Sequence, residues 1–94
     1  EAMDLLQDLA QLDAQRVGLP PRIAELQLLS ARRQAHVLRF WLASMGTQAQ
    51  AAQMQALLIQ VSACKTRGHR IHLKVGQGHV VREGDVLAWL QSKV

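Results

Sequence analysis

The sequence has few of the residues that stabilise secreted domains or mark membrane proteins. A single cysteine, Cys64, excludes an internal disulfide and fits a reducing compartment. Tyrosine is absent and the aromatic residues are Phe40, Trp41 and Trp89, so a core has to be built mainly from Leu, Val, Ile and Ala. No apolar run approaches the roughly 20 residues that span a bilayer, and no signal-peptide pattern opens the chain. We therefore expect a soluble, cytoplasmic protein.

Acidic residues are scarce after the first third of the 94-residue chain. Residues 1–29 contain five acidic and two basic side chains, a net charge of −3, whereas residues 30–94 contain two acidic and nine basic side chains, a net charge of +7. A chain of this length supports one small domain. The larger part of that domain, residues 30–94, is basic. This favours a polyanionic partner, because neutralising phosphates releases bound counterions. Charge alone does not separate RNA from an anionic membrane surface.

Hydrophobic periodicity predicts helices over about residues 2–16, 30–45 and 48–64. In the first, Leu5, Leu9 and Leu12 share a face, and Gly18 with the Pro20-Pro21 pair ends the helix. The apolar segment after the prolines is predicted as one helical turn or an extended plug. The helical pattern is already present at the first residue, without a cap, so we expect a piece of a longer protein.

The stretch from Ser30 to Gly46 carries the clearest helix signals. Ser30 can accept a hydrogen bond from the first backbone amides, and Gly46 can adopt the left-handed conformation that ends a helix. One side of this helix is apolar and includes Trp41, which we predict to be a buried anchor between the helix and the strands that follow. Thr47 is predicted to cap the next helix.

From Arg67 onward the period of the apolar residues changes from 3.6 to 2. This predicts strands at about 69–75, 79–82 and 85–91, joined by turns at 76–78 and 83–84. The third strand, VLAWL, is apolar on both faces, so we expect it to be central or covered by the helices. The predicted fold class is α+β: a small helical subdomain followed by a three-stranded antiparallel meander, all within a single domain over residues 1–94.

The sequence contains no familiar catalytic or metal-binding pattern. A Walker loop, a Rossmann GxGxxG and a GxSxG elbow are all missing. The spacing of Cys64, His69, His72 and His79 matches no usual zinc arrangement, and nothing supplies the third group that would orient a Cys-His nucleophile pair. We predict no catalytic residue, no metal ligand and no cofactor within the chain.

What remains is a set of basic side chains. The predicted phosphate contacts are Arg32, Arg33 and Arg39 on the helix at 30–45, with Arg70 and Arg82 on the strands. Both groups would merge around one rim if the meander packed on the apolar side of that helix. The alternative is a solvated surface with no ligand.

Three stretches resemble the central substrate-binding domain of bacterial tRNA(Ile)-lysidine synthetases: EAMDLLQDLAQLDAQR, LQLLSARRQAHVLRFWLASMG and VVREGDVLAWLQ. The most specific part runs from Ser30 to Gly46, where the family shows a serine, paired arginines and a Leu-Arg-x-Trp-Leu element, here Leu38 to Leu42. Two departures stand out. Phe40 replaces a second arginine, and Val81-Arg82-Glu83 replaces a common Arg-Arg-Tyr run.

The resemblance implies a domain that grips tRNA of the isoleucine type without catalysing a reaction. Enzymes of that family use ATP to adenylate the wobble cytidine, and lysine then displaces AMP to form lysidine. Their SGGxDS loop is not in this sequence, so ATP and lysine are implied for a missing N-terminal catalytic domain, which becomes an expected partner. No membrane is implied, and the oligomeric state is left open, a homodimer included.

Two alternatives to tRNA binding remain open. The C-terminal stretch VGQGHVVREGDVLAWLQSK resembles half of a lipoyl or biotinyl barrel, which would make the chain a carrier or adaptor module. No lysine occupies the hairpin tip there, half a barrel leaves open strand edges, and the helices stay unexplained. The other alternative is a structural spacer whose positive charge only confers solubility.

Overall fold

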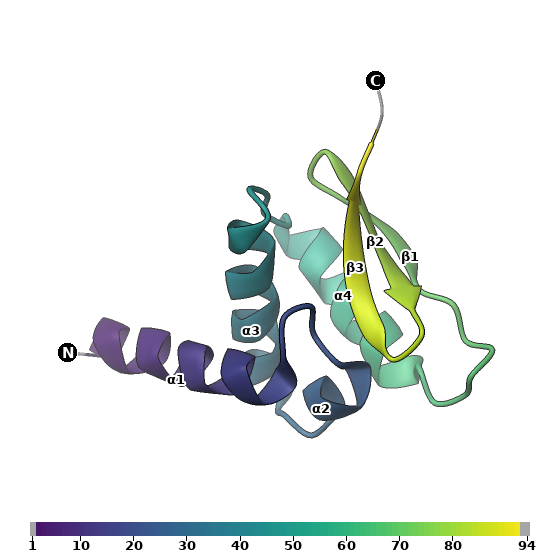
Figure 1. Ribbon diagram of the computed structural model, residues 1–94. Coiled ribbons are helices and arrows are strands. Elements are labelled where there is room, and N and C mark those ends of the chain that lie inside the picture. The colour runs from purple at the N-terminus through teal and green to yellow at the C-terminus, as the bar shows by residue number, and fades with distance from the viewer. Residues whose placement is uncertain (1, 93–94) are drawn as a thin grey trace.

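Four helices precede three strands in the computed structural model, which describes residues 2–92 (Figure 1). The elements are α1 (Ala2–Val17), α2 (Ile23–Gln27), α3 (Ala31–Ser44), α4 (Ala51–Ala63), β1 (His72–Val75), β2 (Gly78–Glu83) and β3 (Val86–Gln91). This confirms the α+β class. The segment after the prolines is the short helix α2, with Ile23 and Leu26 buried. No described helix is both long and apolar enough to cross a membrane.

The three strands form an antiparallel sheet in the order β1-β2-β3. The expectation of a central third strand is wrong, because β2 is central and β3 lies at the edge. Part of that edge is nevertheless covered by the chain after α1. Ile23 N donates to Asp85 O and Leu87 N donates to Pro21 O, each over 2.9 Å. Leu87 is fully buried, while Leu90 further along β3 is 53% exposed.

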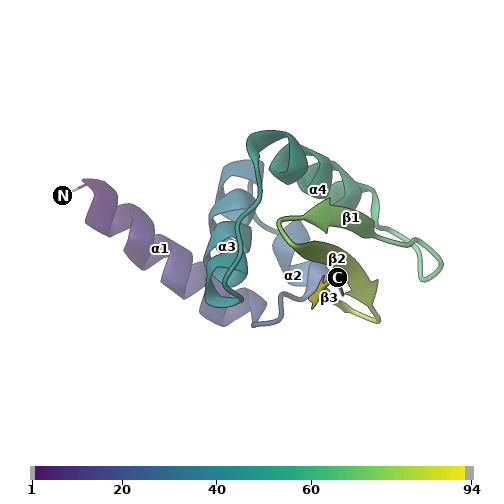
Figure 2. The ribbon, with the colours of Figure 1, turned by 90° about the horizontal axis from the view of Figure 1, so that it is seen from above.

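Helix α4 lies between α3 and the sheet (Figures 1 and 2). It contacts β1, α2 and α3, and α3 in turn packs on α1. One core joins these elements, and it includes Trp41, at 3% exposure, and the fully buried Leu57 of α4. The meander therefore packs on α4, and the packing on α3 that would merge the basic groups around one rim is not the arrangement observed.

The ends of the helices follow local chemistry. The Ser30 hydroxyl accepts from Arg33 N at 3.3 Å, and Gly46 has a φ of +80° just after α3, as predicted. The N-cap of α4 is Gln50 and not Thr47, because Gln50 and Gln53 form a reciprocal capping box. At the other end, Gln27 Nε2 donates to the carbonyls of Val61 and Cys64, over 2.8 and 2.7 Å. These bonds tie α2 to the end of α4.

Helix α1 is turned differently from what its leucines suggest. Leu5 is 70% exposed and Leu12 62% exposed, whereas Asp13 is only 4% exposed. The side facing the core carries Ala14 and Val17 beside Asp13. The reason is the burial of Asp13, which binds a side chain of α3, and the projection of the start of α1 away from the body (Figure 1).

Candidate nucleic-acid interface

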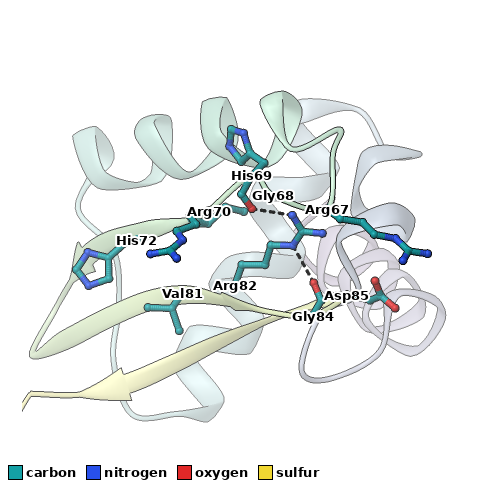
Figure 3. A pocket seen from close by; sticks show the side chains of 10 residues that line it. Arg67, Gly68, His69, Arg70, His72, Val81, Arg82, Gly84 and Asp85 are labelled. Atoms are coloured by element: carbon teal, nitrogen blue, oxygen red, sulfur yellow. Dashed lines mark hydrogen bonds between the residues drawn. The ribbon is translucent and has the colours of Figure 1, made fainter.

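The loop between α4 and β1 borders an open hollow of about 880 Å³. Figure 3 shows Arg70 and His72 at one end, Arg67 and Asp85 at the other, and Arg82 between them. Three guanidinium groups from two segments of the chain thus surround one space. Asp85 is the acidic residue in its lining, so cationic side chains outnumber carboxylates three to one there.

Arg82 organises the hollow through its hydrogen bonds to backbone. Its Nη1 donates to the carbonyls of Thr66 and His69, both over 2.7 Å, and its Nε donates to Gly84 O over 2.8 Å. Figure 3 shows the bonds to His69 and Gly84. All three acceptors are uncharged, so the bonds hold the 66–69 loop in place while the guanidinium keeps its full positive charge. Its Nη2 has no hydrogen bond within the described part of the chain.

Arg67 and Arg70 are exposed and differ from Arg82 in having no structural bonds. Neither forms an ion pair, or a hydrogen bond through its side chain, within the described residues. Their side chains are therefore available to a ligand. An Arg guanidinium presents planar donors that match phosphate oxygens bidentately.

A second basic groove of about 490 Å³ lies between α3 and α4. Arg32, His36 and Arg39 line it from α3, and Leu58 lines it from α4. Arg32 and Arg39 are exposed, and their spacing along the helix places them on the same side. This groove and the hollow at the sheet are lined by different residues.

Arg33 has a different environment from its neighbour Arg32. Its Nη2 donates to Asp13 Oδ1 over 2.7 Å and its Nε to Asp13 Oδ2 over 3.0 Å, a bidentate pair. The hydrogen bond to Asp13, and then the attraction of its charge, raise the pKa of Arg33, although partial burial opposes this. Arg33 therefore stays a cation far above neutral pH. The pair ties α3 to α1.

The structure groups the five predicted phosphate contacts into three places. Arg70 and Arg82 share the hollow at the sheet, Arg32 and Arg39 share the groove on α3, and Arg33 is bound to Asp13. Arg67 was not among the five, although the run TRGHR between a helix and a strand places it beside Arg70. The run that led to the prediction of Arg70 as a phosphate contact therefore also contains Arg67.

The Asp13–Arg33 pair predicts an ordered set of stability losses. R33A leaves the 5% exposed Asp13 carboxylate without its partner, whereas D13A leaves a guanidinium that is already 40% exposed and can be hydrated. We expect R33A to lower the melting temperature more than D13A does. R32A, on the same helix turn, is the control and should change the free energy of unfolding by less than about 0.5 kcal/mol. Thermal melts followed by circular dichroism test this order, and equal effects of R33A and R32A would contradict it.

Comparison with known proteins assigns the family. Residues 22–87 match the family described as the TilS substrate binding domain. The chain belongs to this family. The matched region of the TilS substrate-binding domain runs from the segment that covers β3, through α2, α3 and α4, into β3 itself. The match includes the helices as well as the strands, and the helices are the part that the lipoyl or biotinyl alternative left unexplained.

The chain also matches a longer curated relative. It is 52% identical over 89 residues to the tRNA(Ile)-lysidine synthase of Polaromonas naphthalenivorans (strain CJ2). The alignment covers 95% of the chain and 27% of that protein, so the chain spans about a quarter of the length of the relative. No solved structure matched the chain.

Proposed function

We propose that this domain binds tRNA of the isoleucine type as the substrate-gripping part of a tRNA(Ile)-lysidine synthase. The observation that carries the proposal is the set of three guanidinium groups around one open hollow. Arg82 is fixed to backbone, whereas Arg67 and Arg70 have no ion-pair partner in the part of the chain that the structure describes. Phosphate contacts supply affinity and position an RNA without reading its sequence. The family membership and the relative's activity support the same proposal.

Each arginine has a distinct part in this proposal. Arg67 and Arg70 bind phosphates with whole guanidinium groups, while Arg82 offers Nη2 from the floor of the hollow. Arg32 and Arg39 bind a second stretch of the sugar-phosphate backbone in the groove on α3. Arg33 can add its Nη1, because Asp13 occupies only Nε and Nη2.

In this proposal the domain positions the tRNA for a reaction that takes place elsewhere in the enzyme. ATP and lysine are assigned to the remainder of the longer enzyme, which is the expected partner of this domain, and the proposed location is the cytoplasm. Among the side chains that the structure describes, no three of His, Cys, Asp or Glu gather as a metal site would require. The domain would raise the effective concentration of tRNA at a catalytic centre that lies elsewhere.

Binding of an unmodified isoleucine tRNA transcript to the purified chain tests this function. Each phosphate contact contributes a slope of roughly 0.7 to 0.9 to the dependence of log affinity on log salt concentration. Contacts by the four exposed arginines alone, Arg32, Arg39, Arg67 and Arg70, therefore predict roughly a 50- to 150-fold loss of affinity when the salt concentration is raised fourfold. Fluorescence anisotropy with labelled tRNA measures this directly. A non-cognate tRNA shows whether recognition goes beyond the backbone.

Two single substitutions of equal charge separate the hollow from general electrostatics. R70S removes a cation from the hollow, whereas R16S removes one from α1, where Arg16 is paired only loosely with Glu25 at 4.0 Å. We expect R70S to weaken tRNA binding several-fold and R16S to leave it within twofold. No tRNA binding at low salt, or equal losses for R70S and R16S, would contradict the proposal.

A further inference from the structure

Two histidines form a stacked pair on the outer face of the sheet. The ring centroids of His72 in β1 and His79 in β2 are 4.8 Å apart, and the ring planes differ by 14°. In the register of the sheet, His72 lies opposite Val81 and His79 lies opposite Lys74, so the two imidazoles are diagonal neighbours on one face. His72 is exposed and His79 is half-buried.

The pair is not required by the core or by a polar network. The apolar residues packed in the core from these strands, such as Val75 and Val80, lie on the opposite face. The contact of His79 with another polar side chain is a long one of 3.5 Å, between Nδ1 and the Ser92 hydroxyl. The exposed His72 ring and the half-buried His79 ring thus form a planar surface on the outer face of the sheet, and the polar contact of the pair among the described residues is this long one.

The stack adjoins the basic hollow. His72 is itself part of the lining of that hollow, together with Arg70. In Figure 3 the guanidinium of Arg70 points toward His72. Lys74, which lies across from His79 on the same face, adds another positive charge. The stacked rings of His72 and His79 therefore adjoin the basic side chains that could bind phosphates. Proteins that bind single-stranded nucleic acids combine aromatic rings, on which bases stack, with basic groups along the backbone.

We propose that an unpaired RNA base stacks on the His72–His79 pair while its backbone phosphate lies beside Arg70. The inference rests on the proposed function and specifies which part of an RNA this site accepts. A paired base cannot reach the imidazoles, because its faces are already stacked within the duplex. Charge alone would also suit an acidic peptide, but a carboxylate does not stack on the near-parallel rings of His72 and His79 as a base does.

A pair of matched double variants tests the role of the rings. H72A/H79A removes the aromatic planes, whereas H72F/H79F keeps them and removes the imidazole nitrogens. The probes are a single-stranded RNA 12-mer carrying one 2-aminopurine and a fully paired RNA duplex of equal length. The readouts are the dissociation constants and the 2-aminopurine fluorescence, which falls when the base stacks. Circular dichroism melts check that each variant is folded.

Loss of the aromatic planes should affect the two RNAs differently. We expect H72A/H79A to weaken binding of the single strand by about tenfold, within the range that one base-aromatic stack contributes, and to abolish the change in fluorescence. Binding of the duplex should change by less than twofold, and H72F/H79F should behave like the unmodified chain. Equal losses for single strand and duplex, or an H72F/H79F variant as weak as H72A/H79A, would overturn the stacking proposal alone. Failure of the unmodified chain to bind the isoleucine tRNA transcript would instead overturn the proposed function, and binding of the transcript without binding of the single-stranded 12-mer would overturn the stacking proposal alone.

Discussion

Replacing Trp41 by alanine is expected to lower the free energy of unfolding by about 3 to 5 kcal/mol. Trp41 is 3% exposed in the last turn of α3 and belongs to the core shared by the helices and the sheet. Truncation leaves a cavity that the surrounding helices fill only in part. A domain of 94 residues has a total stability of about 5 to 14 kcal/mol, so this single change removes a large fraction of it.

Phe40 provides the control for Trp41. It is the next residue on the same helix and is also aromatic, but it is 38% exposed. We expect F40A to lower the free energy of unfolding by about 1 to 2 kcal/mol, less than W41A does, because part of the Phe40 side chain is already in contact with water. Urea unfolding followed by circular dichroism gives both values, and Trp89 remains as a fluorescent reporter. A loss for F40A as large as that for W41A would contradict the assignment of Trp41 to the core.

Replacement of Gly78 by a larger residue is expected to be strongly destabilising, because the backbone of β3 leaves no space for a side chain there. A Cβ at this position would collide with the Leu90 carbonyl oxygen and lie 2.9 Å from Cε2 of Trp89. The Trp89 ring crosses here because its Nε1 donates to Val75 O over 3.0 Å. We expect G78A to lower the free energy of unfolding by about 2 to 3 kcal/mol, since β2 and β3 must separate or the indole must move.

Gly68 is the matched control for Gly78. It has no atom within 4 Å of an added Cβ, and its backbone φ is ordinary. We expect G68A to change the free energy of unfolding by no more than about 0.5 kcal/mol. The same urea titration measures both variants, and Trp89 fluorescence should shift in G78A alone. If G78A and G68A are equally stable, the close approach of Trp89 is not a constraint on this sheet.

Local chemistry explains which parts of the fold could be predicted from the sequence. The Ser30 cap, Gly46 after α3 and the change of period near Arg67 depend on neighbouring residues, and these features are present. The orientation of α1 could not be predicted in this way. Its leucine spacing predicts a helix, but the face that is buried depends on Asp13 meeting Arg33, 20 residues further along the chain.

The register of the first hairpin shows a second limit. The turn was expected over 76–78, but the loop is Gly76-Gln77, with Val75 paired to Gly78. Gly76 has a φ of +59° at the first central position, as a two-residue hairpin of the II′ type prefers. A shift of one residue changes every partner across the strands. The proximity of His72 and His79 follows from this register and could not be predicted without it.

The sequence could predict which arginines lie close to one another within a helix or a hairpin. It could not predict how these groups are placed relative to each other in the fold. Helical spacing places Arg32 and Arg39 together, and the hairpin places Arg70 near Arg82. The position of α4 between α3 and the sheet is a result of tertiary packing, which local patterns do not encode. The side chain of Arg82 donates to backbone carbonyls. Every residue has such a carbonyl, so no sequence pattern indicates these hydrogen bonds.

The contact of Pro21–Ile23 with the start of β3 has a consequence for the order of folding. Arg22 and Val86 form an isolated bridge although 64 positions separate them along the sequence. During synthesis the earlier partner emerges long before the later one, so these backbone groups remain solvated until residue 87 has left the ribosome. Contacts this distant in sequence slow folding, because a long loop must close first. We infer that the helices and the meander complete their structure together, once β3 has been synthesised, and not one after the other.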